Sequence, residues 1–272
     1  MFQIAIDAGH YLKTAGKRIP KDLDENQTRE WVLNNRLANY LQKALQAYEN
    51  VETFRTDDPT GAKNTALQTR CDRANDSGAD FFLSVHHNAG IHGGTGGGIV
   101  AYSYEKSKRN SPEYRDAIYD ACIAAGGLKG NRAEPKNTAN FHVLKYTKMP
   151  AVLMEYGFMD SKTDVPVILT DSYAEKMAEA TAAGIAQVAG LTKKQETTGG
   201  FSLPALKKGV KSEAVRAMQA LLQLRGFPCG SQGTDGSFGG NTDKALRSFQ
   251  KAKGIPADGI CGEESWKALL EV

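Results

Sequence analysis

Two of the five histidines in this 272-residue chain end apolar runs, and a glutamate ends a third. His10 closes IAIDAGH, His86 closes DFFLSVH, and Glu155 lies near the end of AVLMEYG. If these runs are parallel neighbouring strands, the three side chains converge at one edge of a sheet. Two imidazoles and one carboxylate form the ligand set of a catalytic zinc site, whose fourth position stays open for water. A second carboxylate can then carry a proton from that water to a leaving group.

The residues alone leave the two carboxylate roles open. Glu155 and Glu30 both lie near the predicted site, and either one suits the role of ligand or of proton carrier. A single histidine at a strand end is more often a surface or hydrogen-bonded residue than a metal ligand. His86 and His87 are adjacent, and because successive side chains on a strand face opposite sides, they cannot share one role.

The apolar pattern before the polar segment at residue 192 predicts strands that alternate with helices. Strands are expected at FQIAI, VETFRT, DFFLSVH, IVAYSY and MPAVLMEYG. Helical spacing is found in residues 30–48, 64–76, 111–127 and 171–190. This alternation predicts an α/β fold, a twisted mixed sheet flanked by helices, with its working residues beyond the carboxyl ends of the strands.

The polar segment KKQETTGG, residues 193–200, lacks apolar periodicity and ends in Gly-Gly, which predicts a linker. We therefore expect one domain over residues 1–191, a linker over 192–203 and a second domain over 204–272. Three short amphipathic patterns follow the linker, in VKSEAVRAMQALLQLRG, NTDKALRSFQKAKG and EESWKALLEV. They predict a small all-α domain of three helices, which suits binding rather than catalysis.

Composition narrows the class further. No run approaches the roughly 18 apolar residues of a membrane helix, and the net charge is only +3. The start, MFQIAIDAGH, lacks the pattern of a signal peptide, so we expect synthesis in the cytoplasm. None of the four cysteines lies in a C-x-x-C pair, which favours free thiols. Cys229 and Cys261 lie in the same segment, so a disulfide between them is the alternative.

Three blocks, IAIDAGH, SVHHNAG and MPAVLMEYGFMDS, resemble the signature blocks of zinc-dependent N-acetylmuramoyl-L-alanine amidases of the amidase-3 family. They occur in the family's order, and the resemblance covers about residues 2–189. It implies hydrolysis of the amide between N-acetylmuramic acid and the L-alanine of the peptidoglycan stem peptide. It also implies that His10, Glu30 and His86 hold Zn²⁺ and that Glu155 is the catalytic glutamate. Glu25, five residues before Glu30, is the alternative ligand.

The remaining histidines, Ser161 and a glycine-rich run are not expected to bind the metal ion. His87 occupies a variable position of the second block, which indicates a structural or surface role, and His92 is expected in solvent. His142 precedes the third block and is a candidate for substrate contact. Ser161 stands where the family usually has asparagine, which affects a local turn or a substrate contact. The run GGTGGG, residues 93–98, neither opens a helix nor ends in GK[ST], so a flexible cleft edge is expected rather than a phosphate loop.

The segment after the linker resembles the small three-helix peptidoglycan-binding domain over about residues 205–270. DGSFGGNT and ALRSFQ match its patterns D-G-x-F-G-x-x-T and A-L-x-x-F-Q. Most of the matching positions are core and turn residues, so they identify the fold rather than the binding surface. The resemblance implies bacterial peptidoglycan as the partner, with neither nucleic acid nor membrane.

Two other functions stay open at this stage. One is a zinc peptidase that cuts within the peptidoglycan peptide. The other is a non-catalytic cell-wall-binding protein on a degenerate scaffold, which the intact His10, His86 and Glu155 disfavour. Together with the expected cytoplasmic synthesis, the resemblance favours a bacteriophage endolysin that acts on the cell wall after release and lyses the host cell. An enzyme of a sporulating bacterium that lyses its own mother cell is the alternative source.

Overall fold

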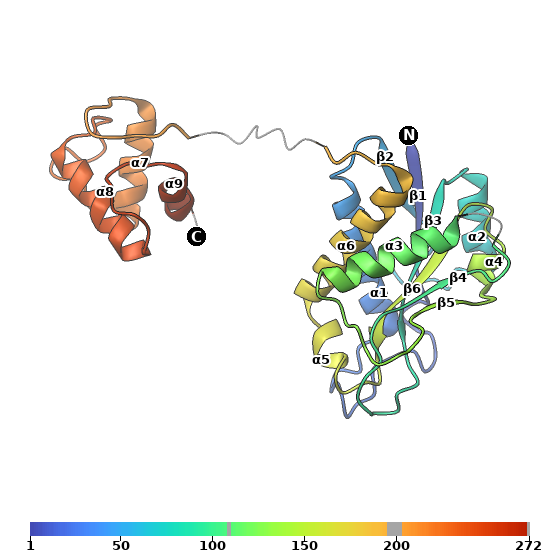
Figure 1. The fold of residues 1–272 in the computed structure, drawn as a ribbon. Helices are drawn as coiled ribbons and strands as arrows, with labels where there is room; N and C mark the ends of the chain where they lie inside the picture. Colours follow the sequence, from blue (N-terminus) through green and yellow to red (C-terminus); the bar gives the residue numbers. More distant parts are fainter. Residues whose placement is uncertain (108–109, 195–202, 271–272) are drawn as a thin grey trace. The chain divides into compact units, whose positions relative to one another are not determined.

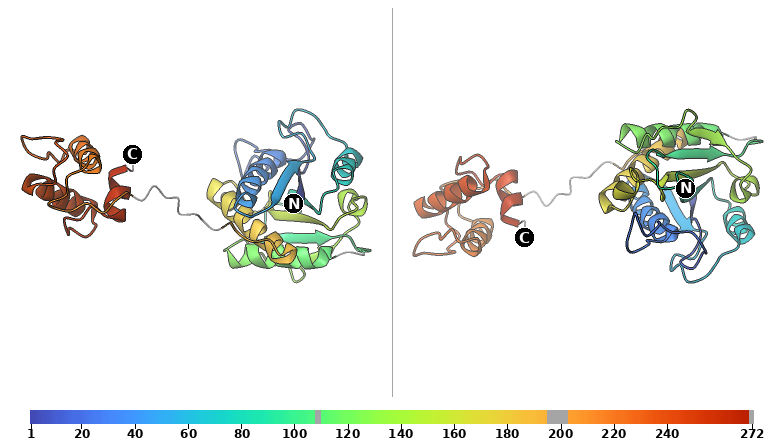
Figure 2. Two further views of the ribbon diagram at one scale, coloured as in Figure 1. Left: turned by 90° about the horizontal axis from the view of Figure 1, so that it is seen from above. Right: turned by 90° about the horizontal axis from the view of Figure 1, so that it is seen from below.

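The computed structural model describes residues 1–107, 110–194 and 203–270 (Figures 1 and 2). The chain divides into two compact units, Met1–Lys194 and Gln195–Val272, and each has its own hydrophobic core. Most of the predicted linker, residues 195–202, lies outside the described residues. Its first residues are described, and Lys193 forms a bridge to Tyr48. In the described part of the chain, no helix has the length and apolar character to cross a membrane.

The first unit is built on a six-stranded sheet in the order β2-β1-β3-β6-β4-β5. The central strands β1, β3 and β6 are parallel neighbours, whereas β4 runs antiparallel to β6, so the sheet is mixed as predicted. The carboxyl ends of β1, β3 and β6 therefore meet at one edge of the sheet. The strands span Phe2–Ala8 (β1), Val51–Arg55 (β2), Phe81–Asn88 (β3), Val100–Ser103 (β4), Lys136–Thr138 (β5) and Ala151–Phe158 (β6).

Helices cover both faces of this sheet, as Figure 2 shows. On one face lie α1 (Glu30–Leu45), α3 (Ser111–Ala124) and α6 (Asp171–Ala189), which share the main core with Leu83 and Val85 of β3. On the other face lie α2 (Leu67–Asp76) and α4 (His142–Lys145), which pack with Phe82. The predicted alternation of faces along β3 is confirmed, and it carries His86 onto the α2 and α4 side.

Three short elements are absent from the sequence prediction: β5, α4 and α5 (Val165–Ile168). Each has three or four residues, too few to show a period. The helix predicted from residue 64 begins at Leu67 instead. The reason is local, since the carbonyl of Thr65 accepts a hydrogen bond from Arg70 Nε at 2.9 Å and Ala66 has an extended ψ of 146°. Thr65 and Ala66 of this extended stretch line a cleft in the first unit.

The second unit contains the three predicted helices, α7 (Glu213–Leu224), α8 (Gly240–Lys253) and α9 (Glu263–Leu270). Gln219 of α7 and Gln250 of α8 each hold the Asp-Gly turn that follows their helix. The Oε1 atom of Gln219 accepts from Gly236 N at 2.8 Å, and its Nε2 contacts Asp235 Oδ1, Ser237 O and Thr242 Oγ1. Gln250 makes the matching contacts with Gly259, Asp258, Ile260 and Ser265. Cys229 and Cys261 are buried and free.

These glutamines lead to a stability prediction. Replacing Gln219, which is 1% exposed, by alanine leaves several buried polar groups of the turn without partners. We expect the free energy of unfolding of the second unit to fall by about 1–3 kcal/mol. Amide hydrogen exchange of α7, α8 and α9 in the full chain measures this loss, because tryptophan fluorescence would report Trp31 of the first unit as well as Trp266. Gln223→Ala, at an exposed site of the same helix, is the matched control and should change it little. Equal unfolding of the two variants would contradict the role given to Gln219.

Candidate metal centre

The structure brings His10, Glu30 and His86 together at the carboxyl edge of the sheet. One ligand atom from each lies within 4.8 Å of the others. His10 Nε2 lies 3.2 Å from Glu30 Oε2, and His86 Nδ1 lies 3.0 Å from Glu30 Oε1. The residues come from three elements: the chain after β1, the first turn of α1 and the end of β3. Glu25, the alternative to Glu30, is exposed and does not belong to this cluster.

Gly9 makes this approach of two histidines possible. A Cβ atom added at Gly9 would lie 2.0 Å from Cε1 of the His86 ring, so any larger residue would displace that ring. The next residue, His10, has a positive φ of 67°, which turns the chain sharply away from the strand direction. Gly9, in the first sequence block, therefore leaves room for the ring of His86, in the second block.

The donor set and the electrostatics of the cluster fit a divalent cation. Glu30 is 1% exposed, and its Oε2 atom has no hydrogen bond of acceptable geometry among the described residues. Burial raises the pKa of Glu30, but contacts with His10 and His86 more than offset this and hold the pKa well below its ordinary value. A buried ionised carboxylate facing two imidazole nitrogens is a set of ligands that zinc prefers.

A second layer of polar contacts orients the ligands. His87 is buried on the opposite face from His86, and its Nδ1 lies 2.8 Å from Asn34 Oδ1. Asn34 Nδ2 in turn donates to the carbonyl of Gly9 at 3.1 Å. Burial lowers the pKa of His87 to about 3, so its ring stays neutral. Of the two roles expected for His87, structural or surface, the structure supports the structural one.

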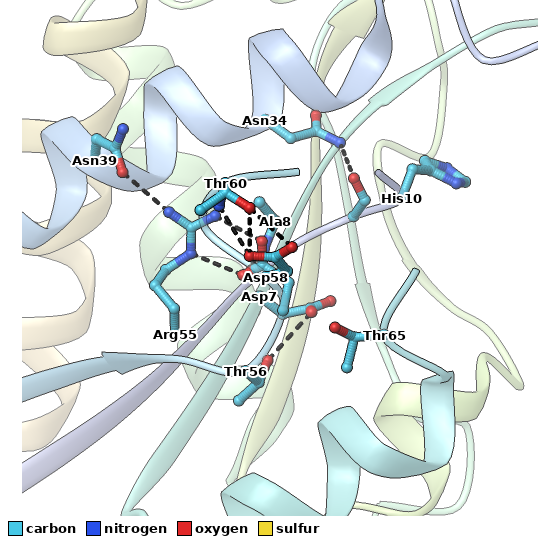
Figure 3. A network of polar contacts seen from close by, with 12 residues as sticks. Asp7, Ala8, His10, Asn34, Asn39, Arg55, Thr56, Asp58, Thr60 and Thr65 are labelled. Carbon is cyan, nitrogen blue, oxygen red and sulfur yellow. Dashed lines mark hydrogen bonds and ion pairs between the residues drawn. The ribbon is translucent and has the colours of Figure 1, made fainter. Parts of the chain in front are cut away.

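The end of β1 is also fixed from the α2 side, by Arg70. Its guanidinium is 2% exposed and pairs with Asp7 at 2.7 Å, and it donates to the carbonyls of Ala8 and His10 at 2.8 Å each. Asp7 also accepts from Thr56 at 3.2 Å (Figure 3). Sequence reasoning missed Arg70 and Asn34, because arginine and asparagine inside helices are usually exposed.

Glu155 of β6 stands directly opposite His86 in the strand register. Burial raises its pKa to about 7, and its Oε2 atom is buried without a hydrogen-bond partner among the described residues. Glu155, His10 and His86 all line one cleft of about 500 Å³. A carboxyl group with a pKa near neutrality is suited to take up a proton and return it in one reaction cycle.

Residues 93–98, which the sequence predicted to form a flexible cleft edge, are not among the residues that line the cleft. Two backbone hydrogen bonds, from Gly93 N to Asp160 O and from Lys162 N to Gly94 O, hold the run against the turn after β6. Asp164 Oδ2 accepts from Gly98 N at 2.8 Å, and Ser161 donates its hydroxyl to the carbonyl of Gly96. The serine at this position thus supports a local turn. His92, in the same loop, is exposed as expected.

The fold and the site together are those of a metal-dependent hydrolase. A mixed α/β sheet gathers three ligands for a cation and one further buried carboxylate at its carboxyl edge, inside an open cleft. This arrangement provides a site for a cation, a group for proton transfer and room for a substrate.

Comparison with known proteins identifies the family. The model of the N-acetylmuramoyl-L-alanine amidase family matches residues 4–187, and the chain belongs to this family. It is a peptidoglycan hydrolase. The model of a putative peptidoglycan-binding domain matches residues 211–269, which carry α7, α8 and α9. The expected partner, peptidoglycan, is therefore confirmed.

Individual relatives agree with this assignment. N-acetylmuramoyl-L-alanine amidase CwlM of Bacillus licheniformis is 32% identical over 229 residues, 84% of this chain and 83% of the relative. A sporulation-specific N-acetylmuramoyl-L-alanine amidase of Bacillus subtilis is 34% identical over 230 residues, with the same shares. The endolysin of Bacillus phage SPP1 is 35% identical over 130 residues, 47% of each chain. The crystal structure of an N-acetylmuramoyl-L-alanine amidase from Clostridium difficile 630 superposes with a TM-score of 0.62 at 25% identity, covering 70% of this chain and 97% of that one.

Proposed function

We propose that His10, Glu30 and His86 hold a zinc ion and that Glu155 is the general acid–base of amide hydrolysis. The bond cut is the one between the lactyl group of N-acetylmuramic acid and the L-alanine of the stem peptide. The observation that carries the proposal is the cluster of three ligand atoms within 4.8 Å, beside a carboxyl group on the neighbouring strand. The exposure of Glu25 supports Glu30 as the carboxylate ligand.

Different residues of the chain have different roles in the proposed reaction. A zinc ion in this site would polarise the amide carbonyl and lower the pKa of water. Glu155 accepts a proton from the attacking water and gives it to the departing alanine nitrogen. In the metal-free chain, burial raises the pKa of Glu155 to about 7, which favours uptake of a proton by this carboxylate. Arg70 and Asn34 hold the backbone around His10, so that its ring keeps one orientation toward the site.

Mass analysis of digested cell wall tests the proposed bond. We expect the enzyme to release new amino termini of L-alanine from purified wall and to leave the glycan strands whole, because hydrolysis separates sugar from peptide. A chelator should abolish the release, and added zinc should restore it. New termini on other residues would instead indicate a peptidase. Binding to wall without any cleavage would indicate a non-catalytic wall-binding protein.

We also propose that the catalytic domain spans residues 1–191, the linker 192–203 and the binding domain 204–272. The division of the chain into two compact units between Lys194 and Gln195 supports these bounds. The binding domain would keep the enzyme on an insoluble substrate and so raise its local concentration.

For its biological role, we propose a phage endolysin that reaches the wall after release from the cytoplasm. The similarity to the endolysin of phage SPP1 supports this origin, whereas the two relatives with longer matches favour a bacterial source. Expression in a Gram-positive host tests it. We expect lysis only when a membrane-permeabilising protein is expressed together with the enzyme. Lysis by the enzyme alone would contradict the need for release.

A further inference from the structure

The lining of the cleft beside the metal centre has two chemically different parts. Near the ligands, the chain after β1 contributes Tyr11, Thr14 and Lys17, which are polar or charged. Another part of the lining, which we call the α2–α4 face, contains Leu67, Phe141, His142 and Val143, and residues 64–66 line the cleft beside Leu67. The helices α2 and α4 that carry it pack side by side (Figure 1).

The α2–α4 face exposes apolar side chains that the core does not cover. Leu67 is 53% exposed and Phe141 is 39% exposed, although both line a concave surface. Apolar side chains exposed in a cleft are typical of ligand-binding surfaces. They suit methyl groups and other short apolar groups of a ligand.

His142 adds one polar group to this face, and its neighbours determine its tautomer. Gln68 Nε2 donates to Asp72 Oδ1 at 2.8 Å, which fixes the orientation of the Gln68 amide. Its Oε1 atom therefore faces His142 Nε2, at 3.0 Å. An oxygen accepts hydrogen bonds only, so Nε2 of the neutral ring carries the hydrogen. Nδ1 is then an acceptor, and none of the described residues occupies it.

We infer that the α2–α4 face binds the stem peptide, and that His142 Nδ1 accepts a hydrogen bond from one of its backbone N–H groups. A stem peptide that begins with L-alanine offers amide N–H donors and methyl groups, which this face complements. N-acetylmuramic acid has one amide N–H and two methyl groups of its own, but it also offers hydroxyl groups and, after hydrolysis, a carboxylate. These groups match the polar part of the lining, where Lys17 carries a positive charge and its Nζ lies 3.6 Å from Glu30 Oε2. The inference rests on the proposed function and assigns each half of the substrate to one part of the cleft lining.

Product inhibition of the full chain tests this assignment with two replacements of His142. His142→Gln keeps a donor near Nε2 for Gln68 but places no acceptor at Nδ1. His142→Asn places an amide oxygen near Nδ1 but loses the contact with Gln68. The inhibitors are a synthetic stem tetrapeptide and N-acetylmuramic acid, each measured against hydrolysis of a muramyl tetrapeptide.

We expect His142→Gln to raise the inhibition constant of the tetrapeptide roughly three- to tenfold, the effect of one lost hydrogen bond. His142→Asn should change it less than about twofold. The inhibition constant of N-acetylmuramic acid and the zinc content should stay unchanged in both variants. His92→Gln, at an exposed histidine outside the cleft, is the control and should change none of these values.

Two results would overturn the inference. If both His142 variants weaken the tetrapeptide equally, the residue acts only through the structure of α4. If N-acetylmuramic acid is weakened instead, the face binds the sugar. If the proposed function itself is wrong, the wild-type chain will leave the muramyl tetrapeptide uncleaved, which distinguishes that result from a failure of this inference.

Discussion

Replacing Glu155 by glutamine should lower kcat roughly 10²- to 10⁴-fold, the usual contribution of a general acid–base, while zinc stays bound. Glutamine fills the same space on β6, but its amide neither takes up nor releases a proton in this pH range. Hydrolysis of a muramyl peptide measures kcat, and atomic absorption measures zinc in the same sample. Glu52→Gln, at an exposed site on β2, is the matched control. Near-normal turnover in Glu155→Gln would remove the proton-transfer role.

The stability of the same variant separates lost chemistry from a damaged fold. Burial raises the pKa of Glu155 from its ordinary value of 4.5 to about 7. In metal-free protein, the unfolded state therefore loses this proton at a lower pH than the folded state. Between about pH 4.5 and 7, the group makes stability fall as pH rises. Glutamine lacks this effect, so metal-free Glu155→Gln should be at least as stable as the wild type at pH 8. An unstable variant would indicate that its low kcat comes from misfolding.

The sequence predicted the edge of the sheet well, because strand ends and side-chain alternation depend on local pattern. His10, His86 and Glu155 were expected to converge if their strands were parallel neighbours, and β1, β3 and β6 have that arrangement. The residues alone did not decide which of Glu30 and Glu155 is the ligand, whereas the resemblance favoured Glu30 over Glu25. The packing of α1 against β3, which buries Glu30 beside His86 and leaves Glu25 exposed, agrees with the choice of Glu30.

The features that the sequence did not predict depend on contacts between segments that lie far apart along the chain. Arg70 lies 63 residues from Asp7, and no local period indicates that α2 turns this arginine inward. The run 93–98 was predicted to be flexible from its glycines alone. In the structure, Gly96, Gly97 and Gly98 have positive φ, and a Cβ atom on any of them would lie within 2.6 Å of a neighbouring residue. Close packing and the positive φ angles therefore explain these glycines.

Adjacent histidines of β3 should give opposite results when each is replaced by alanine. His86→Ala removes one of three ligands, and we expect zinc affinity to fall by more than about 100-fold, beyond the usual effect of a residue that only orients ligands. His87→Ala leaves the ligands in place. It should keep zinc affinity within about tenfold of the wild type but lower the free energy of unfolding by roughly 2 kcal/mol, since Asn34 Oδ1 loses its partner and a cavity remains.

The two variants are matched, because they change the same residue type at neighbouring positions of one strand. Zinc titration with a competing chelator measures the affinity, and urea unfolding with chelator present measures the stability of the metal-free protein. The side chain of His86 contacts Glu30 and that of His87 contacts Asn34, one turn further along α1. A larger loss of zinc affinity in His87→Ala than in His86→Ala would therefore reverse the proposed ligand assignment and require a different set of ligands.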